Sequence, residues 1–192
     1  MARPKEFDPE RALLKAMSLF WRLGYEHTSV EALMREMEIA RQSLYDTFGD
    51  KRALYLKALA FYRDRTNGAM QRMFESTPSV KAGFVKLLYG LAGESREQHE
   101  RGCLLLSANL QRDPKDVIVS NFLRDNQARV EEIFDSALRR AQKEGELSAK
   151  ADTAALARFF AVTIQGMRAM ARLHPDRKAL EQVARVALGV FG

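Results

Sequence analysis

The sequence predicts an all-α protein in which a three-helix N-terminal domain is joined by one long helix to a larger helical domain. Apolar residues recur at helical spacing along most of the chain, which is the pattern of amphipathic helices. Two short segments of this kind, 28–37 and 40–48, are separated by a gap that fits only a tight turn, as in a helix-turn-helix. From residue 50 to about residue 74 the period continues without a breaker, which predicts the connecting helix.

The composition limits which classes of protein this chain can belong to. The chain has 192 residues, 46% of them hydrophobic, which is enough for one large or two small domains with a real core. It contains no apolar run of the roughly 18 residues that a membrane span requires, and no apolar stretch follows the basic N-terminus, as a secretory signal would need. The single cysteine, Cys103, excludes an internal disulfide framework. We therefore expect a soluble cytoplasmic protein.

The charge permits binding to nucleic acid but does not demonstrate it. The net charge is +6 and the sequence pI is about 9.6. Residues 1–60, however, hold ten basic and nine acidic side chains. Any affinity for DNA must come from the direction in which these charges point rather than from bulk charge.

The first helix is expected to begin with Asp8 as its N-cap and Pro9 at its first position, where the missing N–H costs nothing. Gly24 is expected to end it as a C-cap. Residues 2–6 form a polar arm, which either lies along DNA or is an unstructured tail. Thr28 is expected to open the second helix in a capping box with Glu31.

The third helix has two kinds of position. Leu44 and Phe48, with Thr47, fall at helical spacing and can pack inward. The outward positions all carry hydrogen-bond formers: Arg41, Gln42, Ser43 and Tyr45. Arg can bind guanine and Gln can bind adenine through two hydrogen bonds, and hydroxyl groups suit phosphate oxygens. This mixture predicts a helix that reads a DNA groove.

The rest of the chain is expected to be helical with two interruptions. A helix is predicted from Pro78 to Gly93, followed by the polar stretch ESREQHERG, which we expect to be a solvated loop rather than a metal site around His99. Asp113-Pro114 is expected to start a long amphipathic helix that ends at residues 143–145. Two further helices are predicted over 152–173 and 176–191.

These last two helices are apolar over much of their circumference, so each must bury more than one side. In a small domain the second surface is most simply covered by a partner subunit, in a four-helix bundle about a two-fold axis. The alternative is a pair of helices buried within one chain. The expected dimer interface is Leu156, Phe160, Ile164, Met167, Leu180, Val183, Ala187 and Val190.

The segment LYDTFGDKRAL resembles the signature of the TetR family of transcriptional repressors, in which L-Y-x-x-F runs into a Gly/Asp turn and a Lys. Gly24 to Thr28 matches the family's G-x-x-x-T, and the R-G-C-L-L segment ending at Leu105 resembles one branch of it. The sequence departs from the family pattern at Glu38, where the turn usually carries Gly, and at Ala40, where a capping residue is usual.

The resemblance implies a homodimer that binds a near-palindromic double-stranded DNA operator and releases it when a small molecule of unknown identity binds the C-terminal domain. Residues 1–50 would then be the DNA-binding domain, and residues 51–192 the effector-binding and dimerisation domain. The candidate DNA contacts are Thr28, Ser29, Arg41, Gln42, Ser43, Tyr45 and Lys51. For Tyr45 and Lys51 the alternatives are a packed aromatic ring and a solvated surface lysine.

The resemblance places the effector pocket between the long helix and the helices up to about residue 140. The candidate lining residues, each of which could equally be ordinary core, are Phe61, Tyr62, Met70, Met73, Phe84, Leu88, Cys103 and Phe122. A helix start behind Gly102 would favour the thiolate of Cys103, whereas its apolar neighbours favour an inert buried thiol.

Signatures of enzymes are missing: the chain has no Gly-rich phosphate loop, no G-x-S-x-G and no H-E-x-x-H. We therefore expect neither catalysis nor a bound metal or other cofactor. The main alternative to a repressor is a helical protein-interaction module that has a helix-turn-helix shape and does not bind DNA.

Overall fold

The computed structural model describes residues 7–192, so the polar arm at residues 2–6 lies outside the described part. All regular structure in that part is helical: α1 (Pro9–Leu23), α2 (Val30–Met37), α3 (Arg41–Phe48), α4 (Lys51–Ser76), α5 (Val80–Ala92), α6 (Arg96–Arg101), α7 (Leu104–Gln111), α8 (Val117–Lys143), α9 (Thr153–Leu173), α10 (Arg177–Leu188) and a terminal 3₁₀ turn (Gly189–Phe191). The predicted all-α class is confirmed. No helix in residues 7–192 is both long enough and apolar enough to cross a bilayer.

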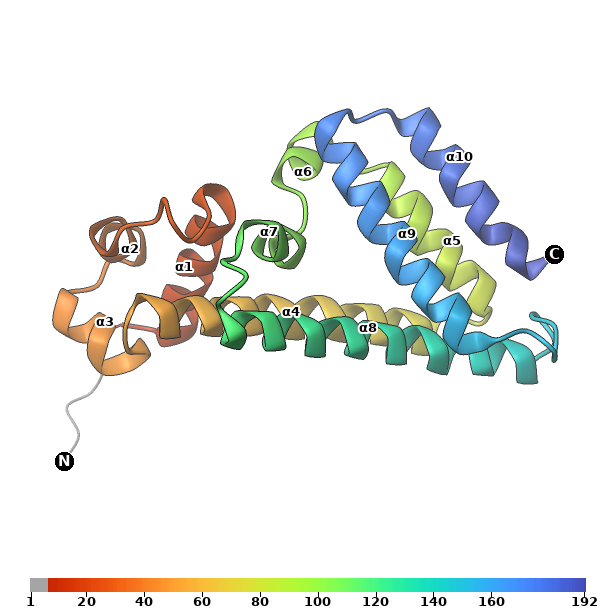
Figure 1. The fold of residues 1–192 in the computed structure, drawn as a ribbon, viewed down its shortest axis with the longest axis horizontal. Helices are drawn as coiled ribbons and strands as arrows, with labels where there is room; N and C mark the ends of the chain where they lie inside the picture. The colour runs from red at the N-terminus through yellow and green to blue at the C-terminus, as the bar shows by residue number, and fades with distance from the viewer. Residues whose placement is uncertain (1–6) are drawn as a thin grey trace.

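We call α1–α3 the head and α5–α10 the body. Figure 1 shows the head at one end of the molecule and the helices α5, α9 and α10 at the other. The long helices α4 and α8 run side by side along the base, while α6 and α7 lie between the two ends (Figure 1). Helix α4 therefore belongs to both ends, as the unbroken helical period predicts.

Two hydrophobic cores divide the molecule. The head core contains Phe20, Leu33 and Leu44, but it also includes Leu59 of α4 and Leu104 of α7. The body core is built around aromatic rings and includes Phe84, Phe134 and Phe160, with ring centroids of Phe84 and Phe160 4.0 Å apart. The head core thus extends beyond residue 50 and takes in the start of α4, the helix α7 and the beginning of α8.

Most predicted helix ends are confirmed by their caps. The side chain of Asp8 accepts hydrogen bonds at the start of α1, and Gly24 ends that helix with φ +79°. At this φ a residue with a Cβ atom would be strained, which explains the glycine. The predicted last two helices match α9, capped by Asp152, and α10 with its terminal 3₁₀ turn.

Three predictions of local structure were wrong. Helix α2 begins at Val30 with Ser29 as its N-cap, so Thr28 forms no capping box with Glu31. The stretch expected to be a solvated loop forms α6, with a capping box between Ser95 and Gln98 and with His99 buried. Helix α8 begins at Val117 behind Asp116, because the Asp113-Pro114 pair forms a turn before it.

Candidate DNA-binding surface and effector cavity

The turn between α2 and α3 is tight because one residue adopts a left-handed conformation. Glu38 has φ +58° and ψ +43°, and it is the one non-glycine residue with positive φ in residues 7–192. Its carboxylate lies 2.8 Å from Lys15 of α1. The next residue, Ile39, is buried, and α3 begins after Ala40, which supplies no side-chain cap. Glu38 thus occupies the turn position where the family usually has Gly, and Ala40 leaves the start of α3 without the usual side-chain cap, as the sequence indicates.

Helix α3 is anchored on one side and exposed on the other. Leu44 and Phe48 are buried in the head core, whereas Arg41, Gln42 and Tyr45 are exposed. Ser43 is half-buried. The helix therefore presents a polar face to solvent, as the arrangement of its residues predicts.

Two acidic side chains hold the polar groups of this face, and the sequence analysis missed both. Nε2 of Gln42 donates to Oδ1 of Asp46 over 2.7 Å, one helical turn later. The guanidinium of Arg41 is paired with the carboxylate of Glu31 on α2. The spacing of Gln42 and Asp46 by four residues was a usable signal for the first pair. The second pair depends on the angle between two helices and had no local signal.

Thr28 lies inside the head rather than on its surface. Its side chain is fully buried, and its hydroxyl donates to the carbonyl oxygen of Gly24 over 2.6 Å. This hydrogen bond ties the loop after α1 to the start of α2. Ser29 instead caps α2, accepting from the N–H of Ala32 over 3.0 Å. In this conformation Thr28 has no surface to offer a phosphate.

Lys51 begins α4 beside the helix-turn-helix. Its Nζ lies 4.3 Å from the centre of the Tyr25 ring, a cation–π contact that holds the ammonium at the end of the head. Burial, with help from the charge of Glu26, raises the pKa of Tyr25 above its usual value of 10.0, so this ring stays neutral under Lys51. The N-cap of α4 is Asp50, whose carboxylate accepts from the N–H of Ala53.

A cavity of about 550 Å³ lies between α4, α5, α7, α8 and α9. Of the predicted lining residues it includes Tyr62, Met70 and Cys103. Phe84 and Leu88 are instead fully buried in the body core, and Met73 packs against that core. Phe61 and Phe122 pack against the head core. These five were wrong as lining residues because apolar periodicity does not distinguish a cavity wall from close packing.

The polar lining of this cavity is the part that sequence reasoning missed. Amide side chains face one another across it: Asn67 of α4 bonds Asn126 of α8 over 3.0 Å, and Gln165 of α9 bonds Gln127 of α8. Three arginines, Arg112, Arg124 and Arg168, also line it. For Gln165 the available signal was an amide within an apolar stretch of α9. Asn67, Asn126 and Gln127 stand among polar residues and had no such signal.

The cavity and the head share a wall. The Tyr62 ring lines the cavity and packs edge-on against the Trp21 ring of α1, with centroids 4.8 Å apart. Nε1 of Trp21 donates to the carbonyl oxygen of Arg101 at the end of α6 over 2.9 Å, and the Arg101 guanidinium stacks 3.8 Å from the indole ring. Arg52 of α4 pairs with Asp116, the cap of α8. A change in the position of α6 or α7 would therefore act directly on α1.

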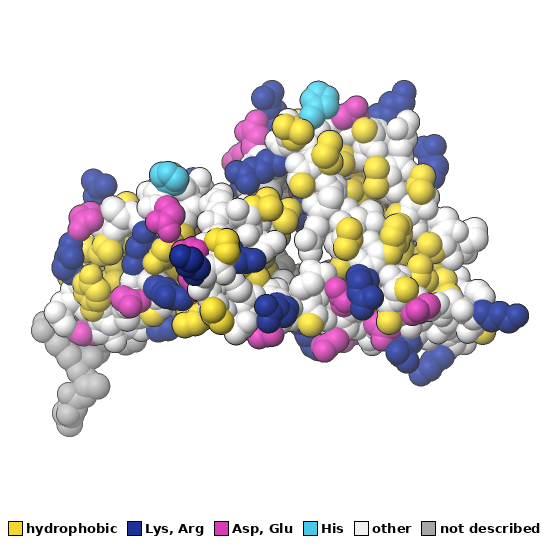
Figure 2. All heavy atoms as spheres, viewed as in Figure 1, with side chains coloured by type: hydrophobic (Ala, Val, Ile, Leu, Met, Phe, Trp, Pro, Cys, Tyr) yellow, Lys and Arg dark blue, Asp and Glu magenta, His cyan; other side chains and the backbone are white. Residues whose placement is uncertain are grey.

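An apolar surface covers the outer side of α9 and α10. Figure 2 shows several hydrophobic side chains on the surface of this part of the molecule. We call its exposed members the α9–α10 face: Phe159, Val162, Met170, Leu173, Val183 and Val186. Of the predicted interface residues, Val183 belongs to this face, whereas Leu156, Ile164 and Val190 are half-buried and pack against the body core.

The other four predicted interface residues lie inside their own chain. Phe160, Met167, Leu180 and Ala187 are buried in the body core. They were wrong because α9 and α10 each carry two apolar stripes, and the stripe chosen from the sequence faces α5 and α8 rather than the outside. The alternative of two helices wholly buried within one chain is also wrong, since Val186 and Leu173 are nearly four-fifths exposed.

Comparison with known proteins identifies relatives along the whole chain. Residues 12–58 match the family model for bacterial regulatory proteins of the tetR family, and residues 88–187 match the model for the tetracyclin repressor-like C-terminal domain. The chain is 31% identical to YezE of Bacillus subtilis (strain 168), an uncharacterized HTH-type transcriptional regulator, over 100% of both. It is 30% identical to the HTH-type transcriptional repressor ComR of Escherichia coli (strain K12), over 98% of this chain and 91% of ComR.

Solved structures of other proteins share this fold along nearly the whole chain. A cysteine mutant of the TetR family transcriptional regulator CifR, complexed with 26-bp double-strand operator DNA, superposes with a TM-score of 0.86 at 33% identity over 100% of both chains. Reduced Escherichia coli NemR superposes with a TM-score of 0.83 over 95% of this chain and 96% of that one. At 16% identity the second match shows the fold alone.

Proposed function

The chain belongs to the TetR family of transcriptional regulators, and we propose that it represses transcription in the cytoplasm as a homodimer that releases its operator when a small molecule occupies the cavity. It is a DNA-binding regulator and not an enzyme. The observation that carries the proposal is the polar face of α3. This face is exposed to solvent, and the helix follows immediately after a tight turn.

In the proposed complex, α3 enters the major groove. Gln42 and Arg41 are suited to base edges, while Tyr45, Ser43 and Lys51 are suited to phosphate oxygens. Ser29 lies at the N-terminus of α2, where the N–H groups and the helix dipole favour a phosphate. Thr28 is not part of the proposal because it is buried.

The α9–α10 face supports the dimer. Six exposed large apolar side chains on two neighbouring helices are more than scattered surface residues require. Pairing this face about a two-fold axis would bury them in a four-helix arrangement. The two heads would then present their α3 helices to half-sites about one helical turn of DNA apart.

The wall shared by cavity and head supports the ligand response. A ligand that moves Tyr62 or α7 would shift Trp21 and Arg101, and with them the orientation of α1 and the start of α4. Because both heads must fit a fixed half-site spacing, a small tilt of each would weaken binding.

Selection of bound DNA from a random pool tests the function directly. The expected product is a near-palindromic sequence whose two halves are equivalent, bound by two chains in a gel shift. Failure to enrich any sequence at moderate salt would favour the rival, a protein-interaction module that does not bind DNA.

A further inference from the structure

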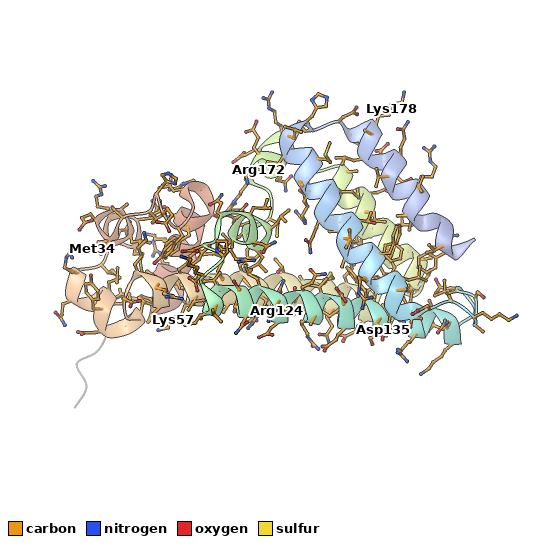
Figure 3. The ribbon with its side chains drawn as sticks, viewed as in Figure 1. Met34, Lys57, Arg124, Asp135, Arg172 and Lys178 are labelled. Carbon is orange, nitrogen blue, oxygen red and sulfur yellow. The ribbon has the colours of Figure 1, made fainter. Side chains whose placement is uncertain are left out.

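The cavity has a charged end and an apolar end, and α8 shows the gradient most clearly. At the end near the head its wall carries Ser120 and Arg124 beside the apolar Leu123, and about one turn further on it carries Asn126 and Gln127. Beyond that, α8 contributes only Val130 and Phe134. Figure 3 places Arg124 on the stretch of α8 below α7, on the side of the body that is nearer the head.

The other helices repeat this order. Helix α9 runs in the opposite direction (Figure 1): Arg168 lines the cavity near Tyr62, while Ala161 and Val162 line it about two turns earlier in the helix. On α4, Thr66 follows Tyr62, and Met70 lies one turn nearer the apolar end. Three helices therefore agree on which end is polar.

The charge at the polar end has one sign. Of the described residues that line the cavity, Arg112, Arg124 and Arg168 are charged, and none is acidic. Arg112 and Arg124 donate to neutral amide oxygens, those of Asn109 and Asn121, over 3.3 and 3.2 Å. Arg168 lies 3.7 Å from Glu94, a carboxylate outside the cavity, with about a quarter of its side chain exposed. Guanidinium groups in such a site attract an anion.

Uncharged polar groups complete this end. The hydroxyl of Ser120 is buried and has no hydrogen-bond partner among the described residues. An orphan hydroxyl is uncommon in a native fold and can be satisfied by a ligand atom. Burial, reinforced by the neighbouring Cys103, raises the pKa of Tyr62 well above its usual value of 10.0, so the phenol at this end stays uncharged.

We propose that the effector is a small organic anion, a carboxylate on an apolar body, with its carboxylate among Arg112, Arg124 and Arg168 and its body against Met70, Val130 and Phe134. This inference rests on the proposed function, because it names the ligand class for the same cavity. A cation would meet three like charges. A neutral ligand would cover the arginines without replacing their hydration, which is unfavourable.

The chain contains its own reporter for the test. Trp21 is the single tryptophan, and its ring packs on Tyr62 at the wall of the cavity. The probes are straight-chain carboxylates from butanoate to decanoate, together with 3-phenylpropanoate, each compared with its primary amide. Titration of the full-length protein is followed by tryptophan fluorescence and confirmed by calorimetry. We expect at least one carboxylate to bind about tenfold more tightly than its amide, as loss of a charge-assisted hydrogen bond predicts.

Variants assign the effect to the charged end. Arg168→Met is expected to weaken carboxylate binding about tenfold and to leave amide binding unchanged. Arg168→Lys is expected to restore part of the loss. Ser120→Ala is expected to weaken carboxylate binding by a few-fold without affecting the contact with Glu94. The matched control is Arg158→Met on the same helix, where the arginine pairs with Glu131 and does not line the cavity. Circular dichroism melts identify any variant that fails to fold.

The outcomes separate this inference from the proposed function. Equal binding of carboxylates and amides, binding of amides alone, or no binding by any member of the panel overturns the anionic class. The proposed function survives each of these results if the protein still selects an operator. Conversely, failure to bind DNA removes the proposed function, while the fluorescence titration still reports what the cavity binds.

Discussion

At the scale of single residues, the polar face of α3 combines groups that can bind DNA with carboxylates that hold them in place. Asp46 fixes the amide of Gln42, and Glu31 fixes the guanidinium of Arg41. A fixed amide loses less conformational freedom on binding than a free one. The same carboxylates repel phosphates, so affinity depends on cations placed at the rim of the surface, of which Lys51 is the best supported by its packing.

Lys51→Ala is expected to weaken binding to every DNA sequence alike, because an ammonium that meets a phosphate carries no base information. The slope of log K against log salt should fall by about one unit for each subunit. Filter binding of operator and scrambled DNA at several salt concentrations measures both quantities. Lys178→Ala removes the same charge from exposed α10, at the other end of the molecule (Figure 3), and should change neither.

Gln42→Ala is expected to relax preference at one base pair in each half-site and to leave non-specific binding almost unchanged. A good bidentate contact discriminates by about 1–3 kcal/mol, so the preferred base should lose roughly tenfold or more of its advantage. Competition with operators substituted position by position checks this. A uniform loss at all positions would show that Gln42 supports the fold of α3 instead of reading a base.

At the scale of elements, side chains from other parts of the chain complete several helix ends. The N-terminus of α5 is an example: the carboxylate of Glu146, in the loop after α8, accepts hydrogen bonds from the N–H groups of Val80 and Lys81 and from the hydroxyl of Ser79. These bonds join two helices that are distant in sequence. The αL turn at Glu38 plays the corresponding part in the head, since it sets the angle between α2 and α3.

Glu146 is expected to make stability depend on acid. Burial alone would raise its pKa, but the hydrogen bonds from Lys81, Ser79 and Val80 outweigh burial and hold the pKa below its ordinary value of 4.5. Because the folded-state pKa lies below the unfolded one, this stabilisation is present above pH 4.5 and is lost as pH falls through the folded pKa. Urea midpoints between pH 3 and 7 should show a steeper acid loss for the wild type than for Glu146→Gln. Glu144→Gln, an exposed neighbour, should behave like the wild type.

Glu38→Gly is expected to raise the melting temperature by roughly 2–4 °C, because glycine adopts the left-handed conformation without steric cost. The substitution also removes the ion pair with Lys15, which contributes little because the Glu38 carboxylate is largely exposed. Glu38→Gln separates the two effects, since it removes the charge and keeps the side chain. If Glu38→Gly lowered the melting temperature, and Glu38→Gln lowered it further, the ion pair would matter more than the backbone.

At the scale of the whole molecule, one continuous path of packed groups joins the three surfaces. The cavity touches α1 through Tyr62 and Trp21, and α9 lines the cavity while its outer side forms part of the α9–α10 face. A ligand can therefore affect the head and the dimer contact through the same helices. The proposed response to a carboxylate depends on this shared wall rather than on a distant relay.

Val186→Glu is expected to convert the dimer to single chains, because a charge in the middle of an apolar contact must be desolvated without a partner. Sedimentation at working concentration measures the mass, and a gel shift should show a corresponding loss of operator binding. The control is Val117→Glu, at a position that is also exposed but lies at the start of α8, outside the α9–α10 face. An unchanged mass for Val186→Glu would mean that the chains pair through another surface.

The amino-acid sequence by itself determined the helical class, the helix-turn-helix and the outward residues of α3, because periodicity and caps such as Asp8 act over a few neighbouring residues. It could not decide which apolar stripe of α9 faces inward, that Thr28 is buried, or that Glu31 holds Arg41. Those outcomes depend on how helices distant in sequence cross one another. The charged end of the cavity also emerged only in the tertiary structure, since its three arginines come from separate segments that no local pattern connects.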